Sequence, residues 1–163
     1  MKKIIAVTLF FFLLLPAACA GAEGATRLLE LRGKIFEEYQ ALQGALATTK
    51  DVAVVYGLSD QCLTTIIRLD AYFTMIGVMD SVRDSGLNEN SLSYILVWLN
   101  GIKNVNGGNM KNLLAKYEVG KDTADHLKKV NSYFMQLGIY VDSEIKQLTI
   151  LRDAFAAKQA GKK

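Results

Sequence analysis

The sequence predicts an all-α protein, an up-down-up-down antiparallel four-helix bundle that follows a cleaved signal peptide. Three observations support this fold class. Apolar residues recur at alternating steps of three and four over four long segments, which is the period of one helix face. Glycine-led turn signals separate these segments. The one proline of the 163-residue chain, Pro16, precedes all four. Long helices joined by short turns run antiparallel to their neighbours, so a bundle is the natural packing.

Residues 1–20 have the three parts of a secretory signal peptide. Met1-Lys2-Lys3 is a basic start, a 12-residue apolar run extends from Ile4 to Leu15, and small residues follow. Twelve residues make a helix of roughly 18 Å, which is too short for a bilayer core of roughly 30 Å. No later stretch reaches 18 consecutive apolar residues. We therefore expect an exported protein and not an integral membrane protein.

Two processing routes fit the residues after the apolar run. Ala18-Cys19-Ala20 matches the small-x-small pattern of ordinary cleavage before Gly21, which would release a soluble periplasmic protein. Alternatively, Cys19 becomes lipidated and anchors the protein to the outer membrane. Pro16 stands where lipidation prefers an aliphatic residue, and this favours ordinary cleavage. In the mature chain, residues 21–25 are then a short tether before the bundle of residues 26–158, and residues 159–163 are a basic tail.

Charge and cysteine content restrict the classes of partner. Removal of residues 1–20 takes away two lysines and leaves 17 basic against 16 acidic side chains. This near-neutral balance gives no reason to expect nucleic acid or an anionic membrane as a partner, so membrane contact would come only through lipid on Cys19. Cys62 is the only other cysteine. Its position on an apolar helix face predicts a buried thiol.

The first and second helices are expected at about residues 26–56 and 60–85. The first has an apolar stripe that starts at Leu28 and is interrupted at Glu38. We expect it to end at Gly57, with Ser59 capping the second helix, because glycine favours helix ends and serine favours helix starts.

The second helix carries more apolar surface than one core stripe requires. Beside a core stripe that includes Cys62 and Leu69 lies a second row, formed by Tyr72, Met75, Met79 and Val82. Methionine-rich apolar rows suit adaptable binding surfaces. This row is either a wide core face or a surface for a protein partner, a second copy in a homodimer, or an apolar ligand.

The third and fourth helices are expected at about residues 89–119 and 123–158. Asn88 and Asp122 are the residues expected to cap them. The fourth helix has an apolar stripe that is interrupted at Glu144. Trp98 stands beside a core position, so it either flanks the core with its indole N–H facing water or anchors a partner. The asparagine-rich stretch 100–112 contains Gly107 and Gly108, the expected hinge, because each helical glycine costs about 1 kcal/mol relative to alanine. The apolar phase is kept across this stretch, which favours a kinked helix over a loop.

The sequence contains no recognisable catalytic or cofactor motif. His126 is the sole histidine, and Asp122 four residues before it supplies only half of a zinc site. We expect both residues to lie in a solvated first turn of the fourth helix, where an acidic side chain favours the helix dipole. We expect no cofactor, no metal and no enzymatic activity. The expected function is that of an exported protein-interaction or structural module in the bacterial envelope, contacting its partner through the second helix. The alternative is a periplasmic carrier or sensor that binds a small apolar ligand in the bundle core.

Overall fold

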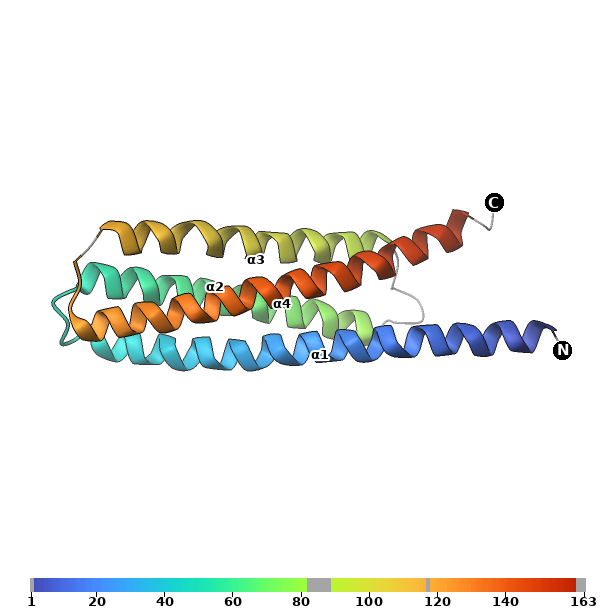
Figure 1. Ribbon diagram of the computed structural model, residues 1–163, viewed down its shortest axis with the longest axis horizontal. Helices are drawn as coiled ribbons and strands as arrows, with labels where there is room; N and C mark the ends of the chain where they lie inside the picture. The colour runs from blue at the N-terminus through green and yellow to red at the C-terminus, as the bar shows by residue number, and fades with distance from the viewer. Residues whose placement is uncertain (1, 82–88, 117, 161–163) are drawn as a thin grey trace.

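The computed structural model consists of four long helices that pack against each other (Figure 1). It describes the backbone of residues 2–81, 89–116 and 118–160, and the side chains of residues 24–78, 89–104 and 118–160. The α1–α2 and α3–α4 connections lie at one end of the bundle, and the N- and C-terminal ends of the chain lie at the other (Figure 1). The helices are α1 (Lys2–Ala45), α2 (Val52–Ser81), α3 (Glu89–Lys116) and α4 (Lys121–Ala160).

The turn between α1 and α2 lies earlier than the sequence predicted, and the expected turn at Gly57 is wrong. Gly57, Leu58 and Ser59 lie inside α2. Leu58 is completely buried, and the Ser59 hydroxyl accepts a hydrogen bond from the Gln43 side chain of α1. These contacts with the core outweigh the cost of about 1 kcal/mol for a glycine inside a helix. The real turn, residues 46–51, ends at Asp51, a residue type that favours helix starts.

α1 begins well before the expected position near residue 26. Residues 21–25, predicted to be a tether, are part of a helix that extends from Lys2 to Ala45. Five of the ten residues 17–26 are alanine, the strongest helix former, so the local sequence supports helix there. Removal of residues 1–20 as a signal peptide stays a prediction.

α3 is a single helix that includes Gly107 and Gly108. The loop alternative for residues 100–112 is therefore wrong, and the kinked or continuous helix is the better description. The hinge itself stays a prediction because the side chains around it lie outside the described residues. The expected capping position at Asn88 also lies outside them. α4 begins at Lys121, just before the predicted start.

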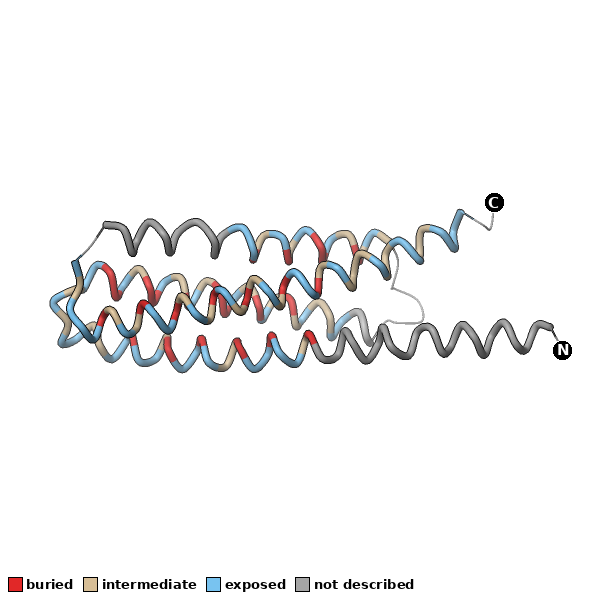
Figure 2. The backbone as a smooth tube through the Cα atoms, viewed as in Figure 1, coloured by how far each residue is buried: buried red, intermediate tan, exposed pale blue. Residues whose placement is uncertain are grey.

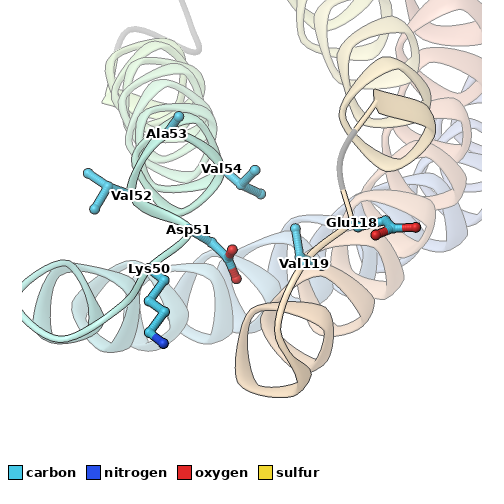
Figure 3. Close-up of a pocket in the computed structure, with 7 residues that line it drawn as sticks. All are labelled: Lys50, Asp51, Val52, Ala53, Val54, Glu118 and Val119. Atoms are coloured by element: carbon cyan, nitrogen blue, oxygen red, sulfur yellow. The ribbon is translucent and has the colours of Figure 1, made fainter.

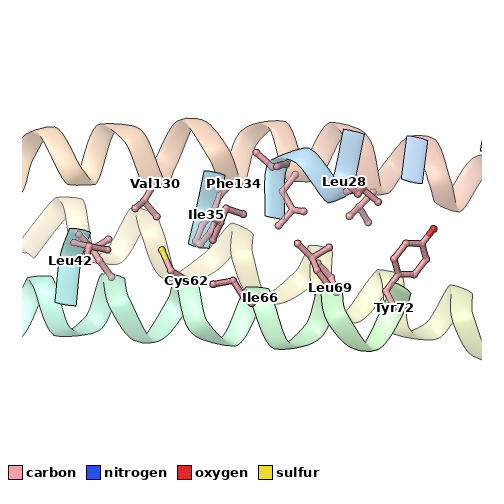
Figure 4. Packing of buried hydrophobic residues seen from close by; sticks show 14 of the residues in the cluster. Leu28, Ile35, Leu42, Cys62, Ile66, Leu69, Tyr72, Val130 and Phe134 are labelled. Carbon is pink, nitrogen blue, oxygen red and sulfur yellow. The ribbon is translucent and has the colours of Figure 1, made fainter. Parts of the chain in front are cut away.

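One apolar face of each helix contributes to a core that follows the long axis of the bundle (Figure 2). Figure 4 shows Ile66 and Leu69 of α2 pointing toward α1 and α4, where Ile35 and Phe134 belong to the same core cluster. Cys62 lies in this row and is completely buried as a free thiol, as predicted. Most described members of the stripes predicted from the sequence meet in this core. Val52 and Tyr56, which the sequence assigned to the stripe of the first helix, are instead exposed on α2.

Asp51 connects the two turns at one end of the bundle. Its carbonyl oxygen accepts the Val55 amide at 3.0 Å, which begins α2. Its carboxylate accepts the Gly120 amide at 2.8 Å and the Thr123 hydroxyl at the start of α4. These hydrogen bonds favour the ionised form and hold the pKa of Asp51 below its ordinary value. One side chain therefore ties the α1–α2 turn to the α3–α4 turn.

Substitution Asp51→Asn is expected to lower the melting temperature at neutral pH because the amide is a weaker acceptor than the carboxylate. The folded pKa of Asp51 lies below its ordinary 3.8, so this stabilisation is present above that value and is lost as the pH falls through the folded pKa. The difference in melting temperature between wild type and Asp51→Asn should become smaller at acid pH. Thermal unfolding followed by circular dichroism measures this difference. Asp60→Asn, at an exposed position of α2, is the control.

Candidate functional site

Two carboxylates lie inside the otherwise apolar core. Glu38 of α1 is 5% exposed and Glu144 of α4 is 3% exposed. They occupy the two positions at which the predicted apolar stripes are interrupted. Burial of a charge costs several kcal/mol unless partners compensate it. Glu38 and Glu144 are therefore the first candidates for functional side chains.

Glu38 meets two basic side chains of α4. Its Oε1 makes a short contact with His126 Nδ1, and its Oε2 lies 3.7 Å from Lys129 Nζ. His126 was expected in a solvated first turn, but its side chain is only 19% exposed and faces α1. Asp122 is exposed, as expected for a residue in a solvated first turn. The fold thus makes His126 part of a helix–helix contact.

Cys62 of α2 lies close enough to Glu38 to be affected by its charge. Burial, and secondarily the charge of Glu38, raise the pKa of the Cys62 thiol to about 12. Cys62 is therefore a thiol and not a reactive thiolate. Within the side chains that the structure describes, no three His, Cys, Asp or Glu residues lie together as metal ligands. The Glu38–His126 contact is a buried polar contact between α1 and α4.

Glu144 joins three helices at the other end of the described core. Its Oε2 accepts a hydrogen bond of 2.8 Å from the Tyr72 hydroxyl of α2. Its Oε1 is buried without a hydrogen-bond partner and lies against Gly24 of α1, where an added Cβ would be 1.8 Å away. Burial raises the pKa of Glu144, and the Tyr72 hydrogen bond offsets part of this rise. A Cβ at position 24 would force this carboxylate to shift.

The predicted partner surface on α2 is largely a core face in the part that the structure describes. Tyr72 is 1% exposed, so its expected surface role is wrong (Figure 4). Met75 is partly buried and packs on the core. The side chains of Met79 and Val82 lie outside the described residues, as does that of Cys19.

Trp98 flanks the core and contacts another helix. Its ring is partly buried against the core cluster, and its Nε1 donates a hydrogen bond of 3.1 Å to the carbonyl oxygen of Arg68 in α2. Arg68 Nη1 in turn donates to the carbonyl oxygen of Gly101 at 3.0 Å. Trp98 therefore stabilises the α2–α3 contact, and its indole N–H is not directed to water as the sequence interpretation had it.

A different apolar row of α2 is exposed to solvent. Steps of four, seven and eleven residues place its members on one helix face, away from the core. The row consists of Val52, Tyr56, Leu63, Ile67 and Val78, which are 51%, 64%, 38%, 59% and 56% exposed. The sequence contained this period, but the misplaced turn at Gly57 assigned Tyr56 to the first helix and split the row.

α1 also exposes apolar side chains close to its polar contact with α2. Leu29 and Phe36 are 57% and 37% exposed. Between the two helices, the Arg32 guanidinium binds the Asp70 carboxylate through Nε at 2.9 Å and Nη2 at 2.8 Å, and it lies 5.3 Å from the centre of the Phe36 ring. We define the α1/α2 apolar surface as these two α1 residues together with Tyr56, Leu63 and Ile67.

An open pocket of about 230 Å³ lies at the turn end of the bundle (Figure 3). Asp51 lines it, but its carboxylate is occupied by the hydrogen bonds of the two turns. The pocket lies outside the core, whereas a carrier would hold an apolar ligand inside the core. Its lining residues are Lys50, Asp51, Val52, Ala53, Val54, Glu118 and Val119.

α2 also passes a length and composition test for a membrane span. The segment Val52–Val78 has a mean hydropathy of 1.2, and 44% of the tested window is buried inside the bundle. A buried core helix passes the same test. An apolar core face combined with an apolar outer row is sufficient to produce this value.

Comparison with protein-family models, curated proteins and solved structures finds no match for the chain. The functional proposal therefore rests on the contacts and exposures described above.

Cys62 is expected to resist alkylation by iodoacetamide in the folded protein. With a pKa of about 12, roughly one thiol in ten thousand is ionised at mildly alkaline pH, and burial blocks access as well. Concentrated guanidinium should restore full reactivity. Mass spectrometry of the Cys62 peptide measures the modified fraction, and rapid labelling of the native protein would contradict this expectation.

Substitution His126→Ala is expected to destabilise the bundle by about 3 kcal/mol, because Glu38 stays buried with only the more distant Lys129 as a counter-charge. The double variant Glu38→Leu/His126→Leu removes both polar side chains and should recover most of this loss. Urea unfolding measures the stability of both variants. Lys128→Ala, which breaks an exposed pair with Asp125, is the control and should change stability by less than about 1 kcal/mol. A double variant no more stable than His126→Ala would refute the explanation that Glu38 needs a buried polar partner.

Proposed function

We propose that this protein is an exported, non-enzymatic up-down-up-down helical bundle that acts as an interaction module in the bacterial envelope. Residues 1–20, with their basic start, apolar run and small residues before Gly21, support export. The contact surface in this proposal is the α1/α2 apolar surface. It replaces the predicted row that begins at Tyr72, because Tyr72 is buried in the bundle.

The exposed row along α2 is the observation that carries the proposal. Scattered exposed apolar side chains are normal, but a contiguous apolar patch on a soluble protein marks an interaction site. Tyr56 and Ile67 are more than half exposed, and Phe36 of α1 lies beside the same helix contact. Burial of such side chains against a partner contributes about 25 cal/mol for each Å² of apolar surface removed from water.

The charges near this surface suit a largely apolar partner. Arg32 and Asp70 neutralise each other through two hydrogen bonds, so they offer no net charge to attract nucleic acid or an acidic headgroup. A helix with its own apolar stripe fits this composition, and a second copy of this chain is one such partner.

The buried carboxylates support a non-enzymatic role. Glu38 and Glu144 are 5% and 3% exposed, and both are engaged with neighbouring helices. A general acid or base must lie within hydrogen-bond reach of its substrate. Both groups instead stabilise or position helices.

A photo-cross-linking residue in place of Ile67, in the full chain exported by bacterial cells, is expected to give a covalent adduct with one protein of defined mass. The reason is that Ile67 lies in the apolar surface that the partner covers. The matched control is Val97 of α3, which is 71% exposed and should give no such adduct. Denaturing gels and mass spectrometry identify the adduct. Equal labelling patterns at the two positions would refute the proposed surface.

Intact mass spectrometry of the same exported protein tests the export part separately. A chain that begins at Gly21 supports soluble export, and acyl groups on an N-terminal Cys19 support the lipid-anchored form. An uncleaved chain would contradict export.

A further inference from the structure

Glu144 has one carboxylate oxygen that lacks a donor, next to the start of the predicted mature chain. Its side chain is 3% exposed, and the Tyr72 hydroxyl uses only Oε2. Oε1 is buried and unpartnered, and it occupies the space beside Gly24 in which a Cβ would lie. A buried acceptor without a donor is unfavourable, so the full-length chain lacks one hydrogen bond at this site.

Cleavage before Gly21 would create donors at this place. In the uncleaved α1, which begins at Lys2, the Gly24 amide donates to the carbonyl oxygen of Ala20, as α-helix geometry requires. After cleavage, residues 21–24 are the first four of the helix. Gly21 then carries the free α-amino group, and the amide hydrogens of residues 22–24 have no acceptor within the helix. Gly21 has no side chain that could cap them. Glu144 Oε1 already lies against the fourth of these residues.

We propose that removal of the signal peptide converts Glu144 from a buried acid with an unpartnered oxygen into the N-terminal cap of α1, supplied by α4. This inference rests on the cleavage before Gly21 that is part of the proposed function. The partial positive charge of a new helix N-terminus also favours the ionised carboxylate.

The alternative cleavage before Cys19 gives a different result at the same residues. It leaves Ala20 in the chain, so the Gly24 amide keeps its helical acceptor and Glu144 gains no donor. The capping arrangement therefore belongs to the soluble form and not to the lipidated one. Because the new cap adds hydrogen bonds, the bundle becomes more stable after cleavage before Gly21 than it is in the uncleaved chain.

The test compares Glu144→Gln in two forms of the chain, the exported form as the cell processes it and the unprocessed full chain, both in the same mild detergent. In the form that begins at Gly21, the substitution should lower the folding equilibrium constant about tenfold, because it removes a charged acceptor from the capping bonds. In the full chain, where this acceptor has no donor, the change should stay below about twofold. Urea unfolding measures both constants.

A second readout follows the Gly24 amide directly. Its hydrogen exchange should be slow in the processed wild type and several-fold faster in processed Glu144→Gln, with no such difference in the full chain. Glu37→Gln, an exposed position on α1, is the matched control and should change neither measurement in either form.

The outcomes separate this inference from the proposed function. Equal effects of Glu144→Gln in the two forms would overturn the cap and leave export and the α1/α2 apolar surface intact. A mature chain that begins at a residue other than Gly21 would also overturn the cap, and the cross-linking at Ile67 would still test the surface.

Discussion

Burial of a continuous apolar stripe along each of four helices is the constraint on which the rest of the structure depends. Glu38 and Glu144 lie in two of these stripes, so packing of the helices forces both carboxylates out of water. Each must then find partners on a neighbouring helix, because an isolated buried charge costs more than local contacts can repay. His126 and Tyr72 supply those partners from α4 and α2.

These polar contacts do more than compensate burial, because they specify how the helices are aligned. Apolar side chains pack with modest loss when a helix slides or rotates, whereas a hydrogen-bonded pair tolerates little displacement. The Glu38–His126 contact aligns α1 with α4, and the Arg32–Asp70 pair aligns α1 with α2. At the turn end, Asp51 joins the two connections. The bundle therefore has polar contacts at several levels along its axis.

α2 differs from an ordinary amphipathic helix because two of its faces are apolar. One face lies in the core around Cys62 and Leu69, and the other presents Tyr56 and Ile67 to solvent. Burial of the first face stabilises the folded chain. The second face stays exposed to solvent in a single chain, so the fold does not explain its apolar composition. The two apolar faces explain the high mean hydropathy of α2. The exposed face is also the physical basis for proposing that α2 binds an external partner.

The positions of the two buried carboxylates were visible in the sequence, but their partners were not. Interruptions of the stripes at Glu38 and Glu144 follow from helical periodicity alone. Which side chain compensates each one depends on the alignment of helices far apart in the chain. For the same reason, the surface role predicted for Tyr72 was wrong, because a second apolar row on a helix is core or surface according to where its neighbours lie.

The sequence by itself determined the all-helical class, the stripes that form the core and the burial of Cys62, because each depends only on the period of apolar residues along a helix. Tertiary structure decided where the first turn lies, since burial of Leu58 outweighs the local preference of Gly57. It also decided that Gly24 and Glu144 meet. Local preferences amount to about 1 kcal/mol for each residue, whereas burial of one large side chain contributes about 2 kcal/mol and acts between segments that only the folded chain brings together.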